Sequence, residues 1–251
     1  MTATILIAAL LPAVLLFGKA RFSRISMFVD LLSTFWHEMA HAVTASALYG
    51  EVDSVRLVPG KRVKTIQGTN TYTHVYSSSG VTNYFTDGSS LRIFLITGAG
   101  YAGPTLLSLA MAASWYVFGL NVFAVIWTVV LLVMMLLASR GIYAWLINVA
   151  SLLMVSFPLW PLEETTLTKH LAAALPTLLI SSLLIYGLKD SLSIFKSMRA
   201  IERGEVPATG DSDTEKLGSM TGIAPSLWAA LYVILSFVGI VAVPSLLIWQ
   251  N

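Results

Sequence analysis

The nine residues Thr34-Phe35-Trp36-His37-Glu38-Met39-Ala40-His41-Ala42 place three ionisable side chains inside an apolar run that extends from Met27 to Tyr49. An ionisable group in apolar surroundings costs free energy unless it is paired, so such groups within membrane segments usually serve a function. His37 and His41 are four residues apart and therefore lie on one face of a helix, where both imidazoles can bind one metal ion. The stretch predicts a helix with a metal site.

The same stretch has the H-E-x-x-H pattern, in which two histidines bind Zn²⁺ and the glutamate beside them takes a proton from water. We therefore expect His37 and His41 to be zinc ligands and Glu38 to be the general base. The alternative is a pair of interfacial histidines with a solvated glutamate. Because the chain contains no cysteine, a thiolate metal site is excluded.

The composition predicts an integral membrane protein. Of the 251 residues, 56% are hydrophobic and only 11% are charged, and the mean hydropathy is +0.77. The formal net charge of +2 is not gathered in one basic patch, which makes nucleic acid an unlikely partner. The expected partners are the lipid bilayer and a membrane protein or peptide substrate.

Several apolar runs approach the length of about 20 residues that crosses the hydrocarbon core. They predict a single polytopic domain, residues 1–251, with the fold of an all-α membrane bundle of six or seven transmembrane helices. The first run is expected to be a retained helix rather than a signal peptide. Lys and Arg residues mark cytoplasmic loops, but those near the two ends of the chain predict opposite orientations in the membrane, so the membrane orientation stays open. The runs are Ala3–Phe17, Met27–Tyr49, Leu91–Ala113, Val122–Ala138, Ile142–Trp160, Leu171–Leu188 and Leu227–Trp249.

Two polar segments interrupt the apolar runs. Residues 51–90 are rich in Val, Thr, Tyr, Gly and Ser and have turn signals such as Pro59-Gly60, so they predict a small β insertion directly after the metal-binding helix. Residues 199–222 contain many charged side chains and predict a polar connection before the last helix.

A catalytic zinc site normally has three protein ligands, so a third donor is required. Asp190 is the favoured candidate because the helical pattern continues past it and places it on a polar stripe with Tyr186. The alternative is an interfacial Asp190 paired with a nearby lysine. Asp213 is the second candidate, although its Ser-Asp-Thr-Glu setting is also typical of a helix N-terminus. His74 and His170 are weaker candidates.

At these residues the chain resembles the site-2 protease-like intramembrane zinc metalloproteases, in particular a compact branch found in bacteria and plants. The resemblance implies peptide-bond hydrolysis in or near transmembrane segments of membrane proteins, with two histidine ligands, a glutamate base and an aspartate from a later helix. It also implies a multi-pass protein of the bacterial cell membrane. The matching stretches are Phe35–Ala42, Gly80-Val81-Thr82, Gly100-Tyr101-Ala102-Gly103-Pro104, Gly187-Leu188-Lys189-Asp190 and Ser212–Leu217.

Some features depart from this family, and two alternatives stay open. The Asp-Gly pattern of the familiar third ligand occurs only at Asp87-Gly88, within the insertion. A catalytically inactive membrane scaffold or regulatory protein that keeps the protease fold is one alternative. A transporter is the other, although the inverted repeats typical of transporters are not visible in the sequence.

Overall fold

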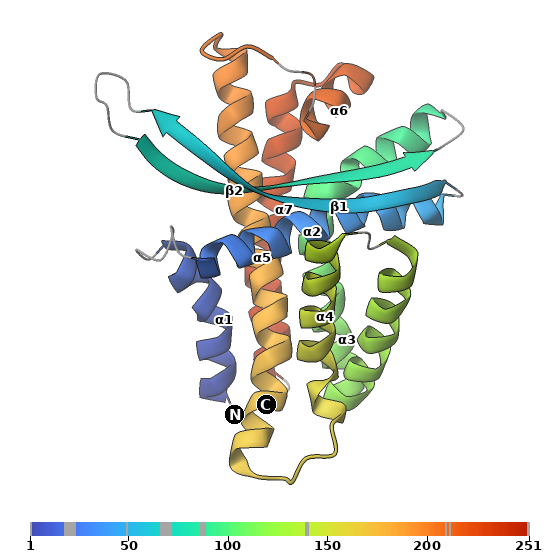
Figure 1. Ribbon diagram of the computed structural model, residues 1–251, viewed down its shortest axis with the longest axis vertical. Helices are drawn as coiled ribbons and strands as arrows, with labels where there is room; N and C mark the ends of the chain where they lie inside the picture. The colour runs from blue at the N-terminus through green and yellow to red at the C-terminus, as the bar shows by residue number, and fades with distance from the viewer. Residues whose placement is uncertain are drawn as a thin grey trace.

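The computed structural model describes residues 2–17, 24–48, 50–65, 72–85, 89–138, 141–208, 210 and 212–249. Long helices run side by side, whereas α2 and a β-hairpin lie across them, and α5 extends beyond the hairpin on both sides (Figure 1). The elements are α1 (Thr2–Phe17), α2 (Arg24–Ala47), β1 (Glu51–Thr65), β2 (Tyr72–Phe85), α3 (Ser90–Ala138), α4 (Ile142–Ser156), the short 3₁₀ helix η2 (Phe157–Leu159), α5 (Thr166–Glu202), α6 (Asp213–Thr221) and α7 (Pro225–Trp249).

Four of the described helices are long and apolar enough to cross a membrane: Ser90–Met135, Ile142–Leu159, Thr166–Glu202 and Pro225–Leu247. Their length and composition indicate a membrane protein. The expected number of six or seven spans is not confirmed. The apolar part of α1 is short, Ala3–Val14, and α2, expected to be a span, is not among the four.

Helix α3 folds back on itself, and two of the expected spans lie in its two arms. Gly119 interrupts the helix with φ 78° and ψ 167°. Trp127 Nε1 donates a hydrogen bond of 2.8 Å to Ser114 Oγ. In a straight helix these residues would be about 20 Å apart along the axis, so the chain must reverse at Gly119. The rings of Trp115 and Phe123 also pack across the bend, with centroids 5.4 Å apart.

The insertion after α2 forms one antiparallel hairpin, as its composition predicts. Strands β1 and β2 pair from Glu51↔Phe85 to Thr65↔Tyr72, with an irregularity between Val52 and Ser54. Val55 of β1 is fully buried, and both strands contact α2. The hairpin therefore packs against the helix that contains the two histidines.

The helices bury polar groups between them and expose apolar side chains outward, as expected for a bundle surrounded by lipid. Thr105 and Ser236 form a buried hydrogen bond of 3.1 Å between α3 and α7. Ser108 donates to the Ile180 carbonyl oxygen of α5 at 3.1 Å. The exposed large apolar residues include Val129, Leu132, Trp145, Leu146, Val238 and Val241.

Substitution of Gly119 should weaken the bundle through the backbone alone. A Cβ at this position would meet no atom within 4 Å, but its φ and ψ lie in a region open essentially only to glycine. We expect Gly119→Ala to lower the free energy of unfolding by about 1–3 kcal/mol, measured by denaturant titration in detergent micelles. Gly98→Ala, within the helical first arm, is the matched control, and equal stability of the two variants would contradict the bend.

Candidate metal centre

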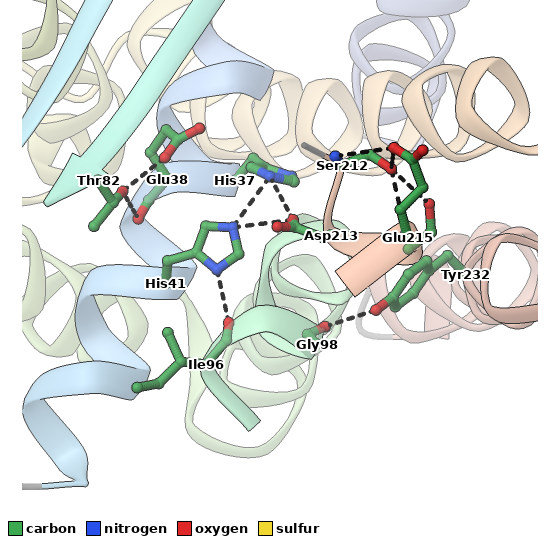
Figure 2. A network of polar contacts seen from close by, with 11 residues as sticks. His37, Glu38, His41, Thr82, Ile96, Gly98, Ser212, Asp213, Glu215 and Tyr232 are labelled. Atoms are coloured by element: carbon green, nitrogen blue, oxygen red, sulfur yellow. Dashed lines mark hydrogen bonds and ion pairs between the residues drawn. The ribbon is translucent and has the colours of Figure 1, made fainter. Parts of the chain in front are cut away.

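Three side chains from two elements converge at one point (Figure 2). His37 Nε2 and His41 Nε2 of α2 are 3.2 Å apart. Asp213 Oδ2, from the first residue of α6, lies 3.2 Å from His37 Nε2 and 3.1 Å from His41 Nε2. Within the part of the chain that the structure describes, these three residues form the group of His, Asp and Glu side chains that could hold a metal ion.

The spacing of the three atoms suits zinc. Tetrahedral ligands at about 2.0–2.1 Å from Zn²⁺ are about 3.3 Å from one another, and the observed separations are 3.1 and 3.2 Å. Two imidazoles and one carboxylate are also a common donor set for zinc, with one position left open for water. The residues therefore fit the metal that the sequence predicts.

The hydrogen bond on the far side of His41 strengthens this fit. His41 Nδ1 lies 2.7 Å from the Ile96 carbonyl oxygen of α3, and because a carbonyl cannot donate, Nδ1 must carry the proton. In the neutral ring, Nε2 then presents a lone pair to Asp213. A carboxylate is also an acceptor, and its buried Oδ2 has no hydrogen-bond partner among the described residues. A cation bound among the three atoms resolves this conflict.

Asp213 is held in its ionised form. With a proton rather than a metal ion between these atoms, burial by itself would raise the pKa of the Asp213 carboxyl group, but the hydrogen bonds and positive charge of the two imidazoles outweigh burial and place the pKa below the ordinary value. The carboxylate is therefore available as an anionic ligand at neutral pH.

The local sequence fixes the position of Asp213 at the start of α6. Ser212 is the N-cap, and its hydroxyl accepts a hydrogen bond from the Glu215 amide at 3.3 Å. The Glu215 carboxylate accepts in return from the Ser212 amide at 3.2 Å, which completes a capping box. Gly222 ends the helix in the left-handed conformation with φ 71°. The N-cap Ser212 and the candidate ligand Asp213 are thus neighbouring residues at the start of one short helix.

A polar cavity of about 610 Å³ adjoins the three side chains. Glu38 also lines it and is 9% exposed, so this residue shares a space large enough for several water molecules with the candidate ligands. The other lining residues come from β2, α3 and α6, and are Val81, Thr82, Tyr84, Ile93, Thr97, Tyr101, Ser212, Lys216, Ser219 and Met220.

The structure brings Asp213 to the histidines in the place where we expected Asp190. Asp190 lies on α5, outside the ligand group, and its Oδ2 accepts a hydrogen bond of 2.7 Å from Ser33 Oγ of α2. Ser33 is one helical turn before His37, so this bond joins α5 to the histidine-bearing face of α2. The polar stripe on α5 thus faces α2 as a packing contact.

The weaker candidates lie elsewhere. The Nδ1 atom of His170 is 2.8 Å from Thr4 Oγ1 and joins α5 to α1. The side chain of His74, and both Asp87 and Gly88, are outside the described residues.

Helix α3 contributes contacts that sequence reasoning did not assign. Tyr101 packs edge-on against His37, with ring centroids 4.6 Å apart, and Tyr232 Oη donates to the Gly98 carbonyl oxygen at 3.2 Å. At Gly100 the helix comes so close that an added Cβ would lie 2.5 Å from His41 Nε2 and 2.6 Å from His37 Cε1. The sequence signal was the glycine spacing at Gly98, Gly100 and Gly103, which is equally typical of close helix packing.

Comparison with known proteins gives one family. The model of the family described as Peptidase M50B-like matches residues 3–243. The matched region contains His37, Glu38, His41 and Asp213. No curated protein and no solved structure matches the chain.

A methyl group at position 100 should disturb the metal centre directly. Gly100→Ala places its Cβ against both imidazoles, so we expect the histidines to separate and zinc affinity to fall by more than about 10-fold. The measurement is zinc per protein after dialysis against a competing chelator. Gly98→Ala is the control, since its Cβ would be 3.9 Å from Tyr232 Oη. Undiminished zinc in Gly100→Ala would contradict the packing of α3 against the site.

Proposed function

Because the chain belongs to the peptidase M50B-like family, we propose that it is an intramembrane zinc metalloprotease. It hydrolyses peptide bonds in or near transmembrane segments of membrane protein substrates. The observation that supports this most directly is the convergence of His37 Nε2, His41 Nε2 and Asp213 Oδ2 within 3.2 Å beside the cavity that Glu38 lines.

In this proposal His37, His41 and Asp213 hold the zinc ion. When bound, zinc acts as a Lewis acid that polarises the peptide carbonyl and makes water more acidic. The Asp213 carboxylate offsets part of the positive charge. His41 keeps its orientation through the Ile96 carbonyl oxygen, because a ligating imidazole is oriented by the hydrogen bond at its other nitrogen.

Glu38 is the general base. Its carboxylate takes a proton as the water oxygen bonds to the carbonyl carbon, and it returns a proton to the amine nitrogen as the carbon–nitrogen bond breaks. Water, the base and the peptide must therefore meet in one space. The polar cavity that Glu38 shares with the two histidines provides this space.

We further propose a multi-pass protein of the bacterial cell membrane. The four apolar helices and the exposed apolar side chains of α3, α4 and α7 suit lipid contact along the bundle. A substrate segment in the same bilayer could then approach the site laterally.

The third ligand can be tested with a matched pair of aspartate variants. Asp213→Asn removes the anionic ligand at nearly constant shape, so we expect zinc affinity to fall by more than about 10-fold. Asp190→Asn should retain zinc, because Asp190 hydrogen-bonds Ser33 instead. Zinc content after equilibration with a chelator measures both. Loss of zinc in Asp190→Asn alone would restore Asp190 as the ligand.

Substitution of Glu38 tests hydrolysis separately from metal binding. Glu38→Gln removes the base but no ligand, so zinc content should stay unchanged while cleavage falls by about 100- to 10,000-fold. Cleavage is measured on a panel of quenched-fluorescent peptides, each with one apolar transmembrane segment, with the fragments identified by mass spectrometry. A zinc-loaded wild type that leaves the whole panel intact would favour the inactive scaffold.

A further inference from the structure

The Glu38 carboxylate is held by a residue of the β-hairpin. Thr82 Oγ1 donates at 2.7 Å to Glu38 Oε2 and lies 2.9 Å from the Glu38 backbone carbonyl oxygen; Figure 2 shows both contacts. A hydroxyl has one hydrogen and donates to one acceptor at a time, and the shorter contact is with the carboxylate. Within the described part of the chain, Thr82 is the residue shown to hydrogen-bond this carboxylate.

The register of the hairpin explains why Thr82 reaches the site. Thr82 pairs with Val55 of β1, and Val55 is fully buried. Successive residues of a strand point to opposite faces, so Thr82 and Tyr84 point to the same face, and both line the polar cavity. Asn83 between them points the other way, and its Nδ2 donates to Ser54 Oγ at 3.1 Å.

A glutamate that acts as a base needs a fixed carboxylate. Its side chain has three rotatable bonds, and transfer of a proton requires the carboxylate to lie within hydrogen-bonding reach of the attacking water. Helix α2 fixes only the backbone of Glu38. The Thr82 hydroxyl donates to the end of the Glu38 side chain, so it limits the rotamers that Glu38 can adopt.

We propose that Thr82 is a positioning residue that holds the Glu38 carboxylate for proton transfer. This inference rests on the proposed protease function. It assigns the β-hairpin a direct part in hydrolysis, because the strand supplies the hydroxyl that orients the base. Thr82 is not one of the three residues that would hold zinc, so its substitution should lower kcat and leave zinc binding unchanged.

The test compares Thr82→Val, which keeps the side-chain shape but lacks the hydroxyl, with Thr82→Ser, which keeps the hydroxyl. On a quenched-fluorescent transmembrane peptide that wild type cleaves, we expect kcat of Thr82→Val to fall about 10- to 100-fold and KM to change less than about 2-fold. Thr82→Ser should restore kcat to within about 3-fold of wild type. Zinc content should equal that of wild type in both variants.

Asn83→Ala is the control for a weakened hairpin. It removes the bond to Ser54 without touching Glu38, so its kcat should stay near wild type. A wild-type kcat in Thr82→Val, failure of Thr82→Ser to restore activity, or equal losses in Thr82→Val and Asn83→Ala would overturn the positioning role. A drop in zinc content of Thr82→Val would do the same. Wild-type protein without zinc and without cleavage of any peptide would instead overturn the proposed function itself.

Discussion

The packing of α2, α3 and α6 depends on one electrostatic constraint. Two imidazole nitrogens and a carboxylate oxygen lie within 3.2 Å of one another and are largely buried, so their lone pairs need a cation between them. Acceptors that face one another without a cation would destabilise the fold. The surrounding elements make this convergence possible. Helix α3 approaches the histidines closely at Gly100, and its Ile96 carbonyl oxygen accepts a hydrogen bond from His41 Nδ1. The capping box at the start of α6 fixes the position of Asp213.

Local periodicity was sufficient to predict that His37 and His41 lie together, because a spacing of four residues on a helix determines which side chains share a face. It was insufficient for the third member. Each of the two candidate aspartates fits a local pattern: Asp190 lies on a polar helical stripe, and Asp213 lies at a helix N-terminus. Both patterns are present in the structure, since Asp190 accepts from Ser33 and α6 has a capping box. Only the tertiary path of the chain after α5 brings Asp213 to α2.

Hydropathy identified the apolar helices but did not determine how each one runs. The expected runs Leu91–Ala113 and Val122–Ala138 lie in two arms of α3, separated by a glycine whose positive φ has no hydropathy signature. Helix α2 was expected to cross the bilayer because most of its residues are apolar, whereas it lies across the bundle (Figure 1). The strands were predicted from a composition rich in Val, Thr and Tyr, but the turn signal at Pro59-Gly60 was wrong, because both residues lie within β1 and pair with β2. The strand register, and hence the contact between Thr82 and Glu38, depends on packing against α2.

The orientation of α2 also separates a polar cavity from an apolar pocket. One face of this helix lines the polar cavity through His37, Glu38 and His41. Its other side, including Met39 and Val43, lines a separate apolar pocket of about 270 Å³. Peptide bonds within a transmembrane helix are already hydrogen-bonded, so a substrate helix must unwind locally before water can attack, and each freed N–H and C=O group then needs a polar partner. Of the two described cavities beside α2, the polar one offers such partners together with space for water. The proposed chemistry is therefore confined to the face of α2 that holds His37, Glu38 and His41 and that Asp213 of α6 approaches.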